Sequence, residues 1–177
     1  MRDINLPNAL TIFRILALPF CAYALFKNGG DDDSWRIIAF TLFFIVGLSD
    51  ILDGKIARSR NQITEFGKLL DPIADKAMLA TASIGASLLG MLSWWVTAIF
   101  LIREVAVTIL RFAVIKNGVI PASKGAKLKT FFQNFSVGFY ILPLPSYLNI
   151  PRDLFMAVAI YLTITTGVTY FRKVFRK

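Results

Sequence analysis

Four aspartates lie in two pairs where one apolar segment ends and the next begins. Asp50 and Asp53 are three residues apart, and Asp71 and Asp75 are four apart. Either spacing places both carboxylates of a pair on one face of an α-helix. Because carboxylates at a membrane edge carry a desolvation cost, they need cations or other partners there. Two helices could direct all four carboxylates to one point, and the pattern therefore predicts a site for divalent metal ions.

The residue types that are scarce exclude several other chemistries. The chain has no histidine and a single cysteine, Cys21. This excludes a disulfide within the chain, zinc sites built from cysteine and histidine, and Ser-His-Asp or Cys-His catalysis. Proton transfer must then use a carboxylate, lysine, tyrosine or water. A metal held here must accept oxygen ligands, which favours Mg²⁺ or Mn²⁺.

The elements that position the aspartates are predicted to be membrane helices. Hydrophobic residues make up 56% of the 177 positions, and the mean hydropathy is +0.62. A spanning helix needs about 20 mostly apolar residues. We predict an all-α, polytopic membrane protein of one domain, residues 1–177, and expect Asp33 or Ser34 to cap its second helix. The six predicted transmembrane helices cover residues 8–27, 35–57, 68–90, 93–115, 127–147 and 152–171.

The net charge of +9 could suggest a nucleic-acid partner, but the positions of the basic residues argue against one. They gather at the N-terminal end, where Arg2 and Arg14 lie, in the second-to-third and fourth-to-fifth connections, and at the C-terminal end. This is the positive-inside pattern of a membrane protein. We therefore predict a multi-pass protein of the cell inner (plasma) membrane, in contact with lipids, with both termini and the aspartates on the cytoplasmic side.

The aspartates belong to a longer pattern, D-x2-D-G-x2-A-R-x8-G-x3-D-x3-D, over residues 50–75. At every fixed position it resembles the signature of the CDP-alcohol phosphotransferase family. Three further stretches resemble the bacterial phosphatidylglycerophosphate synthases of that family: 5–14, Arg103-Glu104 with Arg111, and 127–133. One small departure is Gly125-Ala126-Lys127, where glycine directly before lysine is expected.

The resemblance implies a six-helix enzyme, commonly a homodimer, with a polar cavity that faces the cytoplasm. Such an enzyme would transfer the phosphatidyl group of CDP-diacylglycerol to sn-glycerol 3-phosphate, giving phosphatidylglycerol phosphate and CMP. Two metal ions, Mg²⁺ or Mn²⁺, would be held by Asp50, Asp53, Asp71 and Asp75. Asp75 would also be the general base that takes the proton from the acceptor's primary hydroxyl. The residues that would contact CDP-diacylglycerol are Asn8, Thr11, Gly54, Arg58 and Thr64.

The phosphate of the acceptor requires cationic partners elsewhere in the chain. Arg103 and Glu104 lie in the middle of an apolar segment, where ionisable groups are costly and usually face a cavity or each other. Arg103 and Glu104 could form a structural pair or bind a ligand, and both alternatives are open. Consecutive residues, however, do not share a helix face. Arg111 and Lys127 are the best-placed candidates by sequence. The full set of predicted phosphate contacts is Arg103, Arg111, Lys127 and Lys129.

Two alternatives remain open at this point. The first keeps the reaction class but uses another acceptor, namely inositol phosphate, phosphatidylglycerol or serine. The second is a divalent-cation channel or transporter, which would also place carboxylates inside a helix bundle. A transporter would not need the D-G-x2-A-R element, nor would its acidic residues cluster at one membrane face. Release of CMP separates the enzyme from the transporter.

Overall fold

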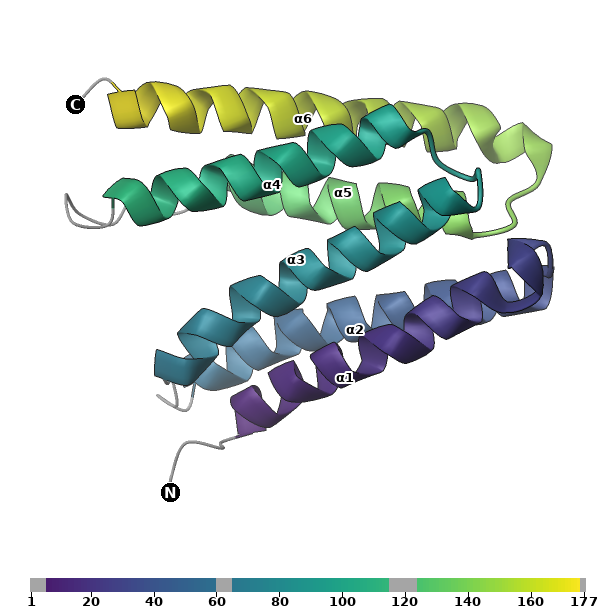
Figure 1. Cartoon of the computed structure of the whole chain (residues 1–177), viewed down its shortest axis with the longest axis horizontal. Coiled ribbons are helices and arrows are strands. Elements are labelled where there is room, and N and C mark those ends of the chain that lie inside the picture. The colour runs from purple at the N-terminus through teal and green to yellow at the C-terminus, as the bar shows by residue number, and fades with distance from the viewer. Residues whose placement is uncertain (1–5, 60–64, 115–123, 176–177) are drawn as a thin grey trace. The chain divides into compact units, whose positions relative to one another are not determined.

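The computed structural model describes residues 6–59, 65–114 and 124–175, with side chains over 9–49, 70–111, 113 and 128–174. These ranges contain six long helices and two short 3₁₀ segments but no strand (Figure 1). The predicted all-α fold with six helices is confirmed. The elements are α1 (Leu6–Phe26), η1 (Lys27–Gly30), α2 (Asp33–Ser59), α3 (Glu65–Leu88), α4 (Trp94–Val114), α5 (Lys124–Ile141), η3 (Ser146–Leu148) and α6 (Asn149–Phe175).

Two helical stretches in the described part of the chain are long and apolar enough to cross a bilayer. They are Ala9–Gly30 and Ser146–Val174, which correspond to α1 and α6. The helices between them carry more ionisable residues, including the two aspartates of α3 and the Arg-Glu pair of α4. The passage of all six helices through a membrane therefore stays a prediction.

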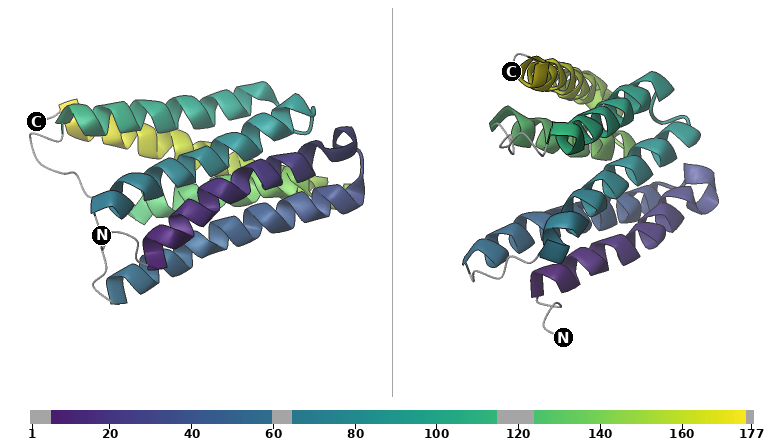
Figure 2. Two further views of the ribbon diagram at one scale, coloured as in Figure 1. Left: turned by 60° about the horizontal axis from the view of Figure 1, so that its bottom comes forward. Right: turned by 60° about the vertical axis from the view of Figure 1, so that its left-hand side comes forward.

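Helices α1, α2 and α3 form one compact unit, and α4, α5 and α6 form a second. In the first unit α1 packs against both α2 and α3, and α1 and α2 run antiparallel, side by side (Figure 2). Small residues allow α3 to approach α1 closely. A Cβ added at Gly85 of α3 would lie only 2.6 Å from Cδ2 of Leu25. The absence of a side chain at Gly85 therefore leaves room for Leu25 of α1 against α3.

The connection between α1 and α2 is built from residues suited to a tight reversal. Asn28 and the two glycines after it have positive φ angles of 54°, 71° and 81°, which asparagine and glycine tolerate best. Asp32 Oδ1 accepts hydrogen bonds from the backbone N–H groups of Ser34 and Trp35, at 2.9 and 3.3 Å. The cap of α2 is therefore Asp32, and not Asp33 or Ser34 as expected. A hydrogen bond from the Asn28 side chain and those from the backbone lower the pKa of Asp32.

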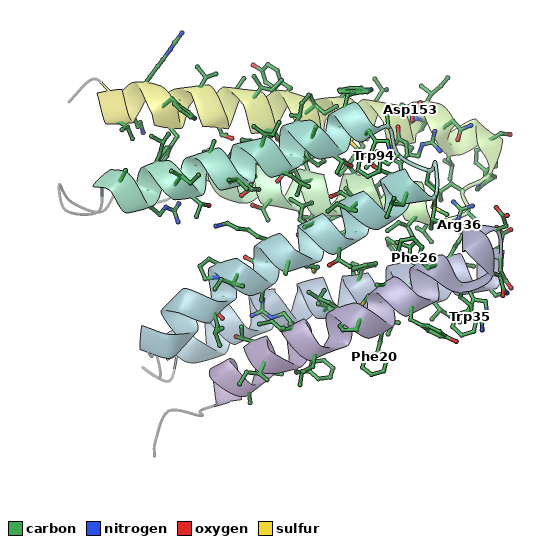
Figure 3. All side chains as sticks on the ribbon, in the orientation of Figure 1. Phe20, Phe26, Trp35, Arg36, Trp94 and Asp153 are labelled. Atoms are coloured by element: carbon green, nitrogen blue, oxygen red, sulfur yellow. The ribbon has the colours of Figure 1, made fainter. Side chains whose placement is uncertain are left out.

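The outer surface of α1 is apolar and ends in an aromatic cluster. Phe20 is exposed and projects away from the helix (Figure 3). The rings of Tyr23 and Trp35 meet edge to face, with their centroids 6.1 Å apart, and Lys27 Nζ lies 5.4 Å from the Tyr23 centroid. An apolar helix face that ends in tyrosine, tryptophan and lysine is typical of a span that reaches a membrane–water interface.

In the second unit the three helices meet around a polar interior. α4 packs on α6, where a Cβ added at Gly167 would lie 3.4 Å from Cγ of Arg103. α5 contacts α6 through aromatic rings. The Phe155 centroid lies 4.5 Å from that of Phe132 and 5.3 Å from that of Phe139. These contacts place polar side chains of α5 beside those of α4 and α6.

Candidate active site

A buried threonine and a buried arginine of α1 contact two aspartates of α3. Thr11 Oγ1 donates a hydrogen bond to Asp71 Oδ1 at 2.6 Å. Arg14 Nη1 donates to Asp75 Oδ1 at 3.4 Å, and Arg14 Nη2 lies 3.6 Å from Asp71 Oδ1. Residues three or four apart share a helix face, so each helix contributes its pair from one side. We call Thr11, Arg14, Asp71 and Asp75 the α1–α3 cluster.

Within the α1–α3 cluster the cation is buried and the carboxylates are open. The Arg14 side chain is 3% exposed, whereas those of Asp71 and Asp75 are 50% and 42% exposed. Arg14 Nη2 also donates to Thr11 Oγ1 at 3.3 Å, which ties the two α1 side chains together. α1 therefore contacts the carboxylates from the buried side, while about half of each aspartate side chain is exposed.

The oxygen donors of this cluster fit a hard divalent cation. Mg²⁺ and Mn²⁺ prefer carboxylate oxygens, and the contacts from α1 converge on Oδ1 of each aspartate. Asp50 and Asp53 lie three residues apart in α2, but their side chains fall outside the described ones. Among the described side chains, no three acidic, histidine or cysteine residues gather. The four-aspartate metal site stays a prediction, with two of its members placed on one face of α3.

The residues predicted to contact CDP-diacylglycerol are described only in part. Asn8 lies in α1, and Gly54 and Arg58 lie in α2, but nothing beyond their place in these helices is described. Thr64 lies outside the described residues altogether. Thr11 is described fully, and it donates its hydroxyl proton to Asp71. The predicted contact of these residues with the nucleotide lipid stays a prediction.

Arg14 is the member of the cluster whose role the sequence analysis missed. Arg14 was placed among the basic residues of the positive-inside pattern and at the end of the resembling stretch 5–14, but it was given no role in the site. A stronger signal was present, because Arg14 is the one charged residue of α1. A charged residue within an apolar helix usually faces the protein interior and a partner, and its position three residues after Thr11 places both on one face.

A second ionic cluster lies in the unit of α4, α5 and α6. Arg103 Nη1 donates to Glu104 Oε1 at 3.0 Å, and Lys129 Nζ of α5 donates to the same oxygen. Arg103 Nη2 donates to Thr166 Oγ1 of α6 at 3.2 Å. The Glu104 side chain is 15% exposed and that of Lys129 is 3% exposed. We call these four residues the Glu104 cluster; it carries one more positive than negative charge.

The Glu104 cluster contains two of the four predicted phosphate contacts. Arg103 and Lys129 are brought together, although they are 26 residues apart in the sequence, because both bind Glu104. Arg103 pairs with its direct neighbour even though consecutive residues leave a helix on different faces, since its long side chain can bend back. Arg111 is exposed in the last turn of α4, outside the cluster. Lys127 lies in α5, but its side chain is not among those described.

Comparison with known proteins adds an independent result. Residues 4–168 match the CDP-alcohol phosphatidyltransferase family. A Mycobacterium tuberculosis protein named probable phosphatidylglycerophosphate synthase is 46% identical over 175 residues, which cover 99% of this chain and 84% of the relative. Relatives from Rickettsia felis and Bacillus subtilis are both named CDP-diacylglycerol–glycerol-3-phosphate 3-phosphatidyltransferase. They are 36% and 35% identical, over 96% of this chain and 95% and 94% of their own lengths.

Proposed function

The chain belongs to the CDP-alcohol phosphatidyltransferase family, and we propose that it transfers the phosphatidyl group of CDP-diacylglycerol to sn-glycerol 3-phosphate. The products are phosphatidylglycerol phosphate and CMP, so the reaction is a step of phospholipid biosynthesis. The names of the relatives support this activity. Within the molecule, the proposal depends chiefly on the half-exposed carboxylates of Asp71 and Asp75, which Thr11 and Arg14 hold from the buried side.

We propose that Asp50, Asp53, Asp71 and Asp75 together hold two divalent ions, either Mg²⁺ or Mn²⁺. Dependence on divalent metal is general in this family. Helix spacing supports the proposal, because the two aspartates of α2 share one face and so do the two of α3, and α2 packs against α3. The chemistry supplied by such ions is neutralisation of the diphosphate and stabilisation of the charge that develops on the leaving oxygen.

The protein's own residues then perform the proton transfer and hold the substrate. Asp75 takes the proton from the primary hydroxyl of glycerol 3-phosphate while that oxygen bonds to the phosphorus that carries diacylglycerol. The anhydride P–O bond on the other side of this phosphorus breaks, and CMP leaves. Arg14 keeps Asp75 in place through the contact at 3.4 Å. The proposed contacts to CDP-diacylglycerol are Asn8, Thr11, Gly54, Arg58 and Thr64.

The Glu104 cluster is the proposed binding site for the acceptor's phosphate. Arg103 and Lys129 are two cations that both contact Glu104 in a largely buried setting, and the four residues of the cluster together carry one more positive than negative charge. A charge-assisted contact with an anion is stronger there than on an exposed surface. Arg111 and Lys127 complete the proposed set, as further contacts near the ends of their helices.

We also propose that all six helices span the inner (plasma) membrane, with both termini on the cytoplasmic side. A polar cavity opens to the same side. The chain forms a single domain, residues 1–177, and assembles as a homodimer. The distribution of basic residues supports the orientation. With Cys21 replaced, a cysteine introduced at Ser59 should be labelled only from the cytoplasmic side, and one introduced at Ser34 only from outside. Labelling of both positions from the same side would contradict the six-span topology.

The experiment that tests the activity is an acceptor panel with purified protein. CDP-diacylglycerol is supplied with radiolabelled glycerol 3-phosphate, inositol phosphate, phosphatidylglycerol or serine, and the lipid product is identified together with released CMP. Glycerol 3-phosphate should be the preferred acceptor. Preference for inositol phosphate would keep the reaction class and reject this acceptor, whereas no CMP release with any of the four would reject the enzyme.

A further inference from the structure

The orientation of one buried amide in the second unit is fixed by its neighbours. Thr163 Oγ1 donates its proton to the carbonyl of Ala159 at 2.6 Å, so its oxygen is left to accept. Gln133 Nε2 donates to that oxygen at 3.0 Å. The amide nitrogen of Gln133 must therefore face Thr163, and the amide oxygen must point elsewhere.

That oxygen is one of several buried polar atoms that lack a hydrogen bond among the described residues. Gln133 Oε1 and Ser136 Oγ both belong to fully buried residues of α5, three apart on one helix face. Arg103 Nε of the neighbouring Glu104 cluster is also buried without a hydrogen-bond partner among the described residues. An unpaired polar atom in an apolar interior carries a substantial desolvation cost. With the Tyr170 hydroxyl of α6, four such atoms lie in this unit, and the two of α5 share one helix face on which a partner from outside the described chain could bind both.

The behaviour of Ser136 differs from that of the other helical hydroxyl groups. Thr108, Thr163 and Thr166 in the same unit each donate to the carbonyl four residues earlier, at 2.6 Å. Ser83, which is equally buried in α3, does the same at 2.7 Å. This local bond satisfies a hydroxyl within its own helix. Ser136 makes no such bond, so its hydroxyl remains able both to donate and to accept.

The unpaired atoms continue the face of α5 that carries Lys129. Lys129, Gln133 and Ser136 are spaced by four and three residues, which is one helix face. Four residues of α-helix rise about 6 Å, so Gln133 follows Lys129 at a distance that a short phosphorylated polyol can bridge. The cations of the Glu104 cluster lie at one end of this face, and two neutral hydrogen-bonding groups lie at the other.

We propose that Gln133 Oε1 and Ser136 Oγ bind the secondary hydroxyl of the acceptor, beside the cluster that takes its phosphate. A hydroxyl group suits both atoms, because it donates to the amide oxygen and accepts from the serine. This inference deepens the proposed function and rests on it for the identity of the acceptor. It assigns to Gln133 and Ser136 the selection of phosphorylated polyols over phosphates that lack this hydroxyl.

The test compares two phosphates that differ in one group. Glycerol 3-phosphate and 3-hydroxypropyl phosphate both have a phosphate and a primary hydroxyl, but the second lacks the secondary hydroxyl. Equilibrium binding of each is measured with the purified full-length protein in detergent, and CMP release is measured in parallel. The unaltered protein should bind glycerol 3-phosphate roughly tenfold more tightly, as expected for one or two neutral hydrogen bonds.

Two variants should remove that preference. Gln133→Met and the milder Ser136→Ala should each weaken binding of glycerol 3-phosphate and leave binding of 3-hydroxypropyl phosphate nearly unchanged, so the ratio should fall to about two. Ser83→Ala is the matched control. It removes a serine hydroxyl that is equally buried but already bonded within its own helix, and the ratio should keep its original value.

Three outcomes would overturn the inference. The unaltered protein could fail to distinguish the two phosphates, or the variants could weaken binding of both equally. The variants could also lower only the melting temperature, as expected if these atoms hold a buried water. Failure of the proposed function is recognised separately, because the unaltered protein would then release no CMP with glycerol 3-phosphate, while the two binding constants would still report on Gln133 and Ser136.

Discussion

The two ionic clusters of this protein use similar residues in opposite arrangements. In the α1–α3 cluster a buried arginine supports two carboxylates that are about half exposed. In the Glu104 cluster a largely buried carboxylate is contacted by a largely buried arginine and a fully buried lysine. The first cluster therefore presents open negative charge, and the second contains surplus positive charge in its interior.

This difference indicates which ligand each cluster can take. Open carboxylates can exchange water for a metal ion at little cost, because they are already solvated. Buried cations instead gain most from an anion that replaces the hydration they have lost. The proposed assignment of a metal to one cluster and of an anion to the other thus follows from burial and not from residue type, because both clusters use similar residue types.

Removal of metal should have the largest effect. If the open carboxylates hold divalent ions, excess EDTA should abolish CMP release, and Mg²⁺ or Mn²⁺ should restore it, since the chain has no histidine and only one cysteine to hold a metal otherwise. The measurement is CMP release before and after readdition, with elemental analysis of the protein. Full turnover in excess EDTA, with no metal found in the protein, would show that the α1–α3 cluster does not bind a catalytic metal.

Substitution of the two α3 aspartates should separate metal binding from proton transfer. Asp75→Asn should lower turnover by about 10²–10⁴, as expected for loss of a general base, while CDP-diacylglycerol binding survives better. Asp71→Asn should weaken Mn²⁺ binding as well as turnover. Asp153→Asn, at an exposed aspartate in α6, is the control. Near-normal turnover of Asp75→Asn at saturating substrates would assign the base to another group.

Stability should respond unequally when one charge is removed from each cluster. Glu104→Gln leaves Arg103 and Lys129 buried without their carboxylate, and a loss of roughly 3–5 kcal/mol in unfolding free energy is expected. Arg14→Met leaves carboxylates that water already reaches, so the loss should be smaller, about 1–3 kcal/mol. Denaturant unfolding in detergent, without metal, measures both. A larger loss for Arg14→Met than for Glu104→Gln would contradict the inference that burial determines the cost of removing a charge.

The last prediction concerns affinity for the acceptor, where one contact and not a whole function is lost. Lys129→Met should raise KM for glycerol 3-phosphate about tenfold or more, because a charge-assisted contact contributes roughly 1.5–3 kcal/mol. KM for CDP-diacylglycerol should stay nearly unchanged. Lys173→Met, at an exposed lysine of α6, is the matched control. Equal changes in both KM values would indicate that Lys129 has a structural role. Arg111→Ala and Lys127→Ala test two further predicted phosphate contacts in the same assay.

Local sequence patterns predicted the helices well because each signal acts over a few residues. Most boundaries of the six helices follow from apolar length and from breakers such as Asn28 and Gly90, which both adopt positive φ. The fifth helix is an exception, because α5 ends at Ile141, six residues before the predicted end at 147 and just before Pro143. The cap of α2 was misplaced by one or two residues, because three consecutive aspartates offer equivalent side chains. Only the fold of the preceding turn, with Asn28 bonded to Asp32, selects among them.

The sequence by itself determined the family, the class of fold and the residues that could bind a metal, since these depend on residue type and spacing along single helices. The tertiary structure decided which residues of different helices meet. It placed Arg14 behind Asp71 and Asp75, paired Arg103 and Lys129 through Glu104, and left Gln133 Oε1 and Ser136 Oγ without a partner among the described residues. The physical reason is burial, because the free energy of a charge or a hydrogen bond depends on its access to water, and that access exists only once the helices have packed.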